Sequence, residues 1–467
     1  MNTKKTKIIC TVSDNNCSVD FIRSLYENGM DVVRLNSAHA SIEGAQKVVD
    51  NVREVSDKIA ILIDTKGPEI RLTAMESTVG FVLKKGERID FIDSTSGLCG
   101  HNGLYTNCQS FVKDVPVGAH ILIDDGSADL IVTEKHNDRL ICEAQNTTVI
   151  KGRKSINVPG VDIELPSLTD KDRMFINWAI DADIEFVAHS FVRSRKDLAE
   201  INAIIESRGS HLKIISKIEN QQGIDNLEEI LNDCYGVMIA RGDLGVEIAA
   251  EKIPHIQEKM IQKCRARKKP VIVATQMLHS MIDNPRPTRA EVTDVSNAIA
   301  QRADAIMLSG ETAFGKYPVE AVRTMCRIAE ESEKYIDVSL DVNLEMVTKP
   351  IAAVLARSIV GATQEIPVKA IIFDTWTGRT GRYLAEFRPK VPIYAMCYNG
   401  FTMREMALSY DIYGYPFEIT GTKEGFVKNS IKILLEDGKI SKGDLVAFIG
   451  GSFNDVLGAT YMEFKYV

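Results

Sequence analysis

Short apolar runs rich in β-branched residues alternate with helical patterns in the first part of the chain. Three such runs, KIICTV, DVVRLNS and AILIDTK, lie at residues 7–12, 31–37 and 60–66. Helix-like segments near residues 18–28 and 41–55 separate them. Strands that alternate with helices are typical of β/α units around a parallel sheet. The opening of the chain therefore predicts three such units.

This alternation stops at Gly67. From there to about Pro166 the chain contains short strands of alternating apolar and polar residues, separated by turn signals, as in GFVLKKGERIDFI and HILIDDGSADLIV. The segment predicts an all-β insert. The β/α pattern then resumes with five further strands, at residues 184–192, 213–219, 236–243, 270–277 and 305–312. Three strands before the insert and five after it make eight.

Eight β/α units spaced by about 30 residues predict a β/α barrel, with a doubly wound sheet as the alternative. Polar clusters favour the barrel, because each falls at the carboxyl end of a strand, where barrels assemble their active sites. A second β/α series begins near Pro350. We therefore expect an α/β protein in three parts: an eight-stranded β/α (TIM) barrel at residues 1–66 and 167–336, an inserted all-β lid domain at 67–166, and a C-terminal α/β domain at 337–467.

Composition narrows the classes of partner. The 467 residues are 45% hydrophobic and carry a formal net charge of −8, as in ordinary globular proteins. No block of lysine and arginine is long enough for a nucleic-acid surface, and no apolar run approaches the ~20 residues of a membrane span. The nine cysteines form no CxxC pair, and the amino terminus does not resemble a signal peptide. We expect a cytoplasmic protein without nucleic-acid or membrane partners.

Candidate chemistry gathers at two of the predicted strand ends. Lys217 and Glu219 are two residues apart on one strand, so both side chains leave the same face. Asp243 ends the next strand, and Gly242 before it allows a ligand to approach the backbone. Mg²⁺ takes one or two protein carboxylates together with substrate oxygens and water. Glu219 and Asp243 could therefore hold a divalent cation beside an anionic substrate.

Each of these motifs also has a simpler interpretation. A Lys-x-Glu pair is most often a surface ion pair, and Gly-Asp after a strand is most often a turn or a helix cap. The functional interpretation depends on convergence, because polar residues at other strand ends would face the same cavity. These residues are Arg34, Asn36, Asp64, Arg71, Thr275, Ser309 and Glu311.

Several of these segments resemble motifs of the pyruvate kinase family. They are RLNSAH, DTKGPEIR, IISKIENQQGI, MIARGDLGVEI, ATQMLHSMIDNPRPTRAEVTDVSNAI and IMLSGETAFGKYPVEAV, and the resemblance runs from about Thr6 through the C-terminal domain. The insert resembles that family's mobile lid, in IDDGSADL and KGRKSINVPGVDIELPSLTDKD. The resemblance implies transfer of the phosphoryl group of phosphoenolpyruvate to ADP, giving pyruvate and ATP, the last step of glycolysis. It also implies a homotetramer.

The resemblance further implies roles for individual residues. Glu219 and Asp243 would hold Mg²⁺, while Lys217 and Arg34 would neutralise the phosphoryl group in transfer. The residues implied at the substrate carboxylate are Gly242, Asp243 and Thr275. Thr275 would also lie near the proton path to the enolate carbon, for which the further candidates are Ser309 and Glu311. The residues implied at the phosphates and wall of the nucleotide site are Arg71, Lys154 and His39.

A monovalent-cation pocket is implied as well, and here the chain departs from the family. Asn36, Asp64 and the carbonyl of Thr65 match ligands of K⁺, and Glu69 is the residue found in potassium-dependent members. The family has a serine ligand where this chain has Ala38. A second departure is SDNNC at residues 13–17, in place of a Gly-Pro-Ala-Ser type of turn beside the nucleotide.

One loop of the C-terminal domain resembles the family's effector loop. It offers hydroxyls and free backbone donors suited to the phosphate of an effector. The loop consists of Thr375, Trp376, Thr377, Gly378, Arg379 and Thr380. A capped helix start with a glycine turn is the alternative, and Trp376 could pack against the protein or stack on a ligand.

Two other functions stay open at this point. A lyase of the wider phosphoenolpyruvate and pyruvate barrel group would share the carboxylate pair, but it would not need Arg71, Lys154 or a lid of about a hundred residues. A ligand-sensing relative with weakened catalysis would fit Ala38, although the retained Lys217 and Glu219 argue against it. An assay with phosphoenolpyruvate, ADP, Mg²⁺ and K⁺ separates the three functions.

Ala38→Ser should lower the K⁺ concentration for half-maximal activity several-fold. The restored hydroxyl would replace one water around the ion, an interaction worth ~1 kcal/mol. Glu69→Lys should reduce the need for K⁺, because a tethered ammonium can stand in for the ion. The measurement is initial rate against K⁺ at fixed ionic strength. A wild-type protein indifferent to K⁺, or an Ala38→Ser curve that coincides with the wild type, would mean that the pocket is vestigial.

Overall fold

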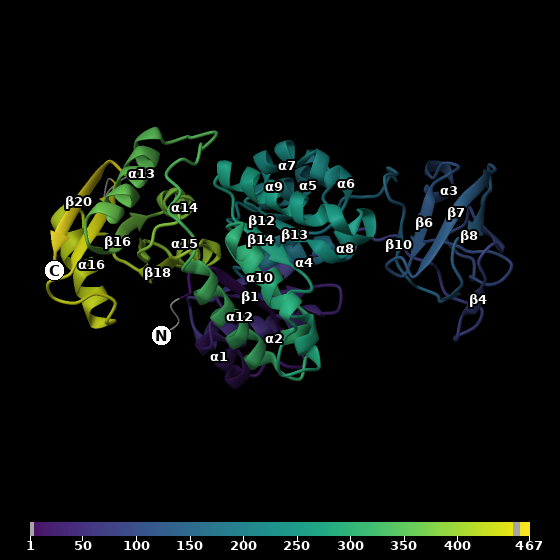
Figure 1. The fold of residues 1–467 in the computed structure, drawn as a ribbon, viewed down its shortest axis with the longest axis horizontal. Helices are drawn as coiled ribbons and strands as arrows, with labels where there is room; N and C mark the ends of the chain where they lie inside the picture. Colours follow the sequence, from purple (N-terminus) through teal and green to yellow (C-terminus); the bar gives the residue numbers. More distant parts are fainter. Residues whose placement is uncertain (1–3, 452–457) are drawn as a thin grey trace.

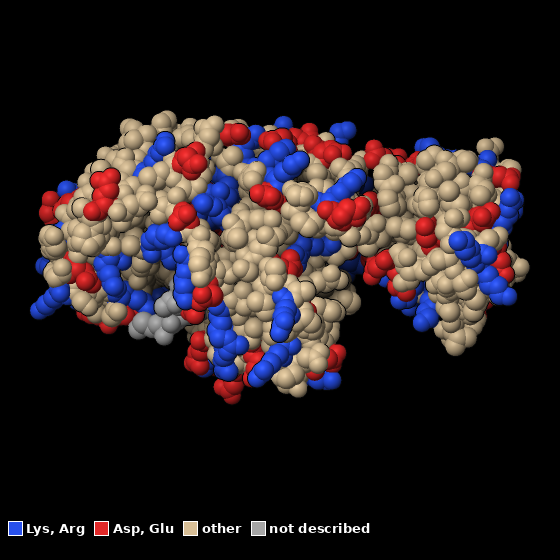
Figure 2. Space-filling model, viewed as in Figure 1, with Lys and Arg blue, Asp and Glu red and all other residues tan. Residues whose placement is uncertain are grey.

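The computed structural model describes residues 4–451 and 458–467. Three compact parts follow one another along its long axis: a C-terminal α/β part, a central barrel and an all-β part (Figure 1). Basic and acidic side chains are interspersed on the face drawn in Figure 2, and the surface narrows between the barrel and the all-β part. No helix of the described residues is long and apolar enough to cross a membrane.

Eight parallel strands close the central barrel in the order β1-β15-β14-β13-β12-β11-β3-β2. They are β1 (Lys7–Thr11), β2 (Val32–Asn36), β3 (Ala60–Asp64), β11 (Phe186–His189), β12 (Lys213–Ile218), β13 (Gly236–Ala240), β14 (Val271–Ala274) and β15 (Ala305–Leu308). The expected barrel is therefore confirmed, and its closure excludes the doubly wound sheet. All eight strands end at the same mouth of the barrel.

Helices cover the outside of these strands. They are α1 (Val19–Glu27), α2 (Ile42–Val55), α4 (Asp170–Asp181), α5 (Arg195–Ser207), α6 (Gln221–Asp225), α7 (Leu227–Asp233), α8 (Arg241–Glu247), α9 (Ile253–Ala266), α10 (Arg289–Ala300), α11 (Gly310–Ala313) and α12 (Pro318–Glu333), with 3₁₀ turns η1 (Ala250–Lys252) and η2 (His279–Ile282). The strands are apolar on both faces, because one face meets the helices and the other fills the barrel. Ile9, Leu62 and Ile215 belong to that buried filling.

The all-β part has a hydrophobic core of its own, made by residues between 70 and 165. Its elements are β4 (Phe81–Leu83), β5 (Arg88–Ile92), α3 (Phe111–Asp114), β6 (His120–Ile123), β7 (Ala128–Lys135), β8 (Arg139–Ala144), β9 (Thr148–Ile150) and β10 (Ile156–Asn157). The two connections to the barrel are tied together, because Oδ1 of Asp172 accepts a hydrogen bond from the backbone N–H of Lys66 at 2.9 Å. Thr169 and Asp172 also form the capping box that starts α4.

The C-terminal part is a five-stranded sheet in the order β18-β17-β16-β19-β20, with β20 antiparallel. Its elements are α13 (Pro350–Glu365), β16 (Val368–Thr375), α14 (Arg379–Glu386), β17 (Ile393–Cys397), α15 (Gly400–Glu405), η3 (Met406–Leu408), β18 (Ile412–Pro416), α16 (Lys423–Glu436), β19 (Leu445–Gly450) and β20 (Tyr461–Tyr466). Leu408 packs with the barrel interior. Arg388 forms a fully buried ion pair of 2.9 Å with Asp304 of the barrel. Separate cores in the three parts support the proposed boundaries near residues 67, 166 and 337.

Deleting residues 67–166 and joining the ends with a short linker should leave a folded barrel with little activity. The insert contributes its own core rather than barrel core, so the barrel should keep its helical circular dichroism and a cooperative thermal transition. Loss of that transition would show that the barrel depends on the insert.

The intact insert should close over the barrel mouth when ligands bind. Hydrogen exchange in the insert and at its junctions beside Pro68 and Pro166 should slow when Mg²⁺, ADP and a substrate analogue are added together. Unchanged exchange under these conditions would remove the support for a lid.

Candidate active site

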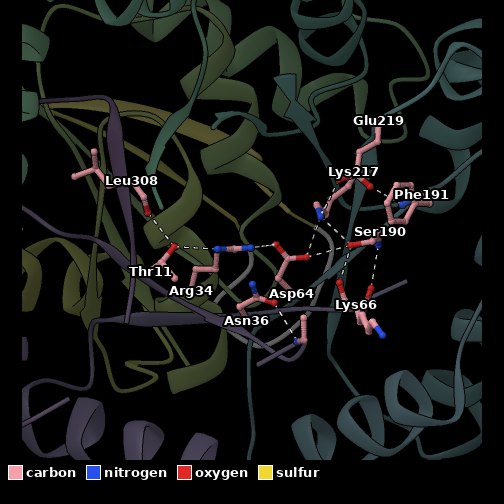
Figure 3. A network of polar contacts seen from close by, with 12 residues as sticks. Thr11, Arg34, Asn36, Asp64, Lys66, Ser190, Phe191, Lys217, Glu219 and Leu308 are labelled. Atoms are coloured by element: carbon pink, nitrogen blue, oxygen red, sulfur yellow. Dashed lines mark hydrogen bonds and ion pairs between the residues drawn. The ribbon is translucent and has the colours of Figure 1, made fainter. Parts of the chain in front are cut away.

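A network of charged side chains joins several strands at the barrel mouth (Figure 3). At its centre is Lys217 of β12, whose Nζ lies 2.9 Å from Oε1 of Glu219 and 3.2 Å from Oδ1 of Asp64. The same ammonium donates a hydrogen bond to Oγ of Ser190, just after β11, at 2.8 Å. Burial would lower the pKa of Lys217, but Asp64 and Glu219 raise it above its ordinary value. The lysine therefore stays charged although only 12% of its side chain is exposed.

Arg34 of β2 extends this network toward the first strand. Its Nη2 lies 2.6 Å from Oδ2 of Asp64, and its Nη1 donates to Oγ1 of Thr11 at 3.0 Å. Thr11 in turn donates to the carbonyl of Leu308 at 2.9 Å. Burial would raise the pKa of Asp64, but Lys217 and Arg34 together hold it below its usual value. Two cations are thus fixed on either side of one ionised carboxylate.

Glu219 and Asp243 form a buried carboxyl pair beside Lys217. Burial raises the pKa of Glu219 to about 7, Asp243 adds to the rise, and Lys217 opposes it. Burial likewise raises the pKa of Asp243, while Lys217 and the neighbouring carboxyl group of Glu219 oppose the rise. Oε2 of Glu219 also accepts from the backbone N–H of Phe191 at 2.7 Å. A divalent cation between the two carboxyl groups would favour the ionised form of both.

The donor set suits a cation that shares its coordination with a ligand. Within the described ranges, no group of three or more His, Cys, Asp or Glu side chains could hold a metal ion. Glu219 and Asp243 would therefore leave most positions to substrate oxygens or water, as Mg²⁺ prefers.

A cavity of about 290 Å³ opens above this pair, between the barrel and the insert. Glu219 and Asp243 line it from the barrel, and Ile156 and Val158 line it from the insert. Asn157 of the insert donates to Oε1 of Glu247 on the barrel at 3.3 Å. The insert is therefore already in contact with the barrel beside the charged floor.

The turn after β14 carries Thr275 in an unusual backbone conformation. Thr275 and Gln276 have φ values of 68° and 54°, which are costly for residues with a side chain and above all for a β-branched one. Oγ1 of Thr275 accepts from the backbone N–H of Gly242 at 2.8 Å. Arg241 holds the turn, because its Nη2 donates to the carbonyl of Thr275 at 2.8 Å while its Nη1 pairs with Asp294 at 2.6 Å. The structure thus brings Thr275 and Gly242 together.

The oxygens of the expected monovalent-cation pocket also lie near one another. Asn36 is opposite Asp64 in the register of β2 and β3. Oδ1 of Asn36 accepts from the backbone N–H of Ala38 at 3.1 Å, and the carbonyl of Thr65 accepts from Oγ of Ser190 at 2.7 Å. The methyl group of Ala38 adds no ligand to this group of oxygens.

The expected nucleotide residues lie farther out, toward the insert. Nη2 of Arg71 pairs with Glu69 at 2.6 Å, and Lys154 pairs with Asp124 at 2.9 Å. His39 is exposed after β2. Arg71 and Lys154 are therefore each paired with an acidic residue. To bind nucleotide phosphates, they would have to release these partners.

Two further candidates for the proton path have structural partners. Both carboxylate oxygens of the buried Glu311 accept backbone hydrogen bonds, from Ser309 at 2.7 Å and from Leu278 at 3.1 Å. Glu311 therefore fixes the loops after β14 and β15, and Thr275 is the better candidate for the proton path.

The effector-like loop has the geometry of a capped helix start. Oγ1 of Thr375 accepts from the backbone N–H groups of Thr377 and Gly378 at 3.2 and 2.7 Å, and Gly378 has a φ of 69°. The ring of Trp376 lies 4.9 Å from that of Tyr398, so this tryptophan packs against the protein. Most residues of the loop, including Arg379 and Thr380, line a small cavity. The packing of Trp376 is therefore compatible with a phosphate site in the same loop.

Several residues of the site, among them Thr11, Ser190 and Arg241, were not predicted from the sequence. Ser190 contacts Lys217, and its position directly after an apolar strand is a signal that could have pointed to it. Arg241 lies in the ARGDLG segment, but no role was predicted for it. Its contacts with Thr275 and Asp294 join residues that are distant in the sequence, so no local pattern predicts them.

A closed β/α barrel with two fixed cations and a carboxyl pair beside an inserted all-β part is typical of an enzyme of phosphoryl-group chemistry. Residues 3–322 match the family model for the barrel domain of pyruvate kinase, and residues 353–462 match the model for its alpha/beta domain. The chain belongs to the pyruvate kinase family. The resemblance noted in the sequence is thereby confirmed.

Individual relatives agree over the full length of the chain. The pyruvate kinase of Borreliella burgdorferi is 46% identical, over 100% of this chain and 98% of the relative. The pyruvate kinase of Geobacillus stearothermophilus is 41% identical, over 96% of this chain and 78% of the relative. The crystal structure of a pyruvate kinase from Cryptosporidium parvum is similar with a TM-score of 0.94 and 34% identity, covering 99% of this chain and 96% of that one.

Arg241→Lys should loosen the turn at residues 274–277. Lysine keeps the charge but cannot reach Asp294 and the Thr275 carbonyl with one planar group, so the turn should lose about 1.5–3 kcal/mol of support. Amide exchange of residues 274–277 should therefore quicken. Asp294→Asn is the matched control, because it keeps the arginine and should have a smaller effect. Equal exchange in Arg241→Lys and wild type would show that Arg241 does not hold the turn.

Proposed function

We propose that this chain transfers the phosphoryl group of phosphoenolpyruvate to ADP, giving pyruvate and ATP. The observation that carries the proposal is the pairing of a fixed cation, Lys217, with a buried carboxyl pair, Glu219 and Asp243, that lines one cavity. Phosphoryl transfer depends mainly on positioning and on electrostatic stabilisation of the moving group. Lys217 and Arg34 supply the positive charge, and membership of the pyruvate kinase family supplies the reaction.

Lys217 is the residue we assign to the transferring phosphoryl group. Asp64, Glu219 and Ser190 hold its ammonium in place, so little reorganisation is needed when charge develops on the phosphoryl oxygens. Arg34 would bind the same group from the side of β2. Opposite-charge pairing with Asp64 keeps both cations from repelling one another at close range.

Glu219 and Asp243 are the residues we assign to Mg²⁺. When bound, the ion would neutralise charge on substrate oxygens and orient them. The raised pKa values of both carboxyl groups support this assignment, because such a pair is costly to ionise without a cation. The backbone N–H of Phe191 fixes Glu219 for the same task.

Thr275 is the residue we place beside the proton path to the enolate carbon. Its hydroxyl donates to the carbonyl of Ala274 at 2.7 Å and accepts from Gly242, so the oxygen has a fixed orientation. The substrate's carboxylate would lie near Gly242, Asp243 and Thr275. Closure of the insert would exclude water, which would otherwise compete with ADP for the phosphoryl group.

Further assignments complete the proposal. K⁺ would be held by Asn36, Asp64 and the carbonyl of Thr65, and the nucleotide by Arg71 and Lys154 beside His39. A phosphorylated effector would bind the loop at residues 375–380, and the assembly would be a homotetramer in the cytoplasm. The purified chain, assayed with phosphoenolpyruvate, ADP, Mg²⁺ and K⁺, should form pyruvate and ATP in equal amounts. Pyruvate with free phosphate and without ATP would indicate a hydrolase, and no consumption of phosphoenolpyruvate would favour the lyase or the ligand-sensing relative.

Glu219→Gln should reduce kcat by orders of magnitude. A neutral amide offers one oxygen and no charge, so it cannot replace a carboxylate ligand of Mg²⁺. Glu247→Gln is the matched control, because Glu247 lines the same cavity away from the charged floor. The measurement is kcat against Mg²⁺ concentration. Wild-type kcat and metal dependence in Glu219→Gln would remove Glu219 from the ligand set.

Lys217→Met should depress kcat while Mg²⁺ and substrate binding stay largely intact. The proposed interaction strengthens in the transition state, so its loss should not appear mainly in KM. Lys213→Met, at the opposite end of the same strand, is the control and should retain wild-type kcat. A raised KM with unchanged kcat in Lys217→Met would overturn the assignment.

A further inference from the structure

A second charged cavity lies where the barrel meets the C-terminal part, away from the barrel mouth. It measures about 260 Å³ and lies between the loop after α9, the start of β13, the linker near residue 346 and helix α14. Five of its lining residues are basic, and no described residue that lines it is acidic. We call this the basic cavity; its cations are Arg267, Lys268, Lys269, Arg379 and Arg382.

The charges of the basic cavity are only partly compensated. Arg267 pairs with Glu228 at 3.0 Å and with Glu345 at 2.7 Å, and Arg382 pairs with Glu405 at 2.8 Å. In the described part of the chain the other three cations form no ion pair with a carboxylate. Five cations therefore line the cavity, and the carboxylates that form ion pairs with them are Glu228, Glu345 and Glu405.

The lysines of the basic cavity are crowded by like charge. Lys268 donates to the backbone carbonyl of Glu345, and Lys269 donates to that of Cys234 at 2.5 Å. Burial lowers the pKa of Lys268, Lys269 and Arg267 lower it further, and Glu386 and Glu345 oppose the decrease. Burial also lowers the pKa of Lys269. A bound anion would relieve this repulsion.

The shape of the basic cavity suits a small molecule. Tyr235 forms part of its wall, and the guanidinium of Arg382 lies 5.2 Å from the centre of that ring. Arginines present planar forks that match phosphate oxygens, and lysines add point charges. A polynucleotide would need an extended basic track, whereas these cations line a single small cavity.

We propose that the basic cavity binds a small phosphorylated anion that bridges the barrel and the C-terminal part. Arg267, Lys268 and Lys269 contact it from the barrel, and Arg379 and Arg382 contact it from α14. The basic cavity is distinct from the cavity that the effector-like loop lines. Thr377 lines only the cavity of the loop, and Arg379 is the one lining residue that the two cavities share. The basic cavity is also separate from the active site, so its test does not depend on the proposed reaction.

The site would connect the anion to the active site through one strand. Tyr235 directly precedes β13, and the residues that follow β13 are Arg241, Gly242 and Asp243. A ligand that draws α14 toward Tyr235 therefore acts at one end of β13, and Asp243, a proposed Mg²⁺ ligand, lies beyond the other end in the first turn of α8.

Calorimetric titration of the full-length chain with inorganic pyrophosphate tests the proposal. A buffer without Mg²⁺ and at fixed ionic strength avoids complexes of the anion with metal. Lys268→Gln changes the basic cavity alone, and Thr377→Val changes the cavity of the effector-like loop alone. Arg379→Gln changes both cavities. Lys154→Gln reports any binding at the nucleotide site, and Lys268→Arg keeps the charge. Melting temperature without pyrophosphate checks that each variant is folded.

The proposal expects saturable binding that Lys268→Gln and Arg379→Gln each weaken on the order of ten-fold, the loss of one charge-assisted contact. Lys268→Arg, Thr377→Val and Lys154→Gln should bind as the wild type does. Absence of binding at millimolar pyrophosphate would overturn the proposal. Weakening by Thr377→Val or Lys154→Gln with no effect of Lys268→Gln would also overturn it, because the anion would then occupy the loop or the nucleotide site.

Discussion

The buried ammonium of Lys217 is the constraint on which the active site depends. A buried charge is costly unless it is paired and hydrogen-bonded, and removing one partner of such a pair typically costs about 3–5 kcal/mol. The partners of Lys217 come from different strands: Asp64 from β3, Ser190 from the end of β11 and Glu219 from the end of β12. These groups meet only when β11 lies between β3 and β12, as it does in the closed barrel.

The two other parts of the chain act on opposite ends of this barrel. The insert is anchored at the mouth, where Asp172 ties the returning chain to Lys66. The C-terminal part is anchored at the other end, through Leu408 in the barrel filling and the buried pair of Arg388 with Asp304. The first anchor holds the insert beside the cavity that Glu219 and Asp243 line. The second anchor joins the C-terminal part to the barrel where β15 begins.

The fold could be predicted from the sequence because its signals are local. Each barrel strand is a short apolar run followed by a polar cluster. A chain with eight such runs and one all-β interruption can adopt few strand topologies. The site residues Lys217, Glu219 and Asp243 could be predicted for the same reason, since strand ends converge in a barrel. In the structure these three residues lie close together, as expected, while their roles stay proposals.

What the sequence did not predict depends on contacts between distant segments. The fork of Arg241 on the carbonyl of Thr275, and the backbone partners of Glu311, join residues from different strands. The five cations of the basic cavity come from two segments more than a hundred residues apart, so no charge run marks them. Such features exist only after the chain has folded.

Anomalous diffraction from a crystal of this protein grown with Mn²⁺ and phosphoenolpyruvate tests the central claim most directly. Manganese takes the same oxygen ligands as magnesium and can be located by its own scattering. The account predicts one strong peak bound by carboxylate oxygens of Glu219 and Asp243, with Nζ of Lys217 directed at the phosphoryl group. A peak elsewhere, with no ion bound by Glu219 and Asp243, would contradict it.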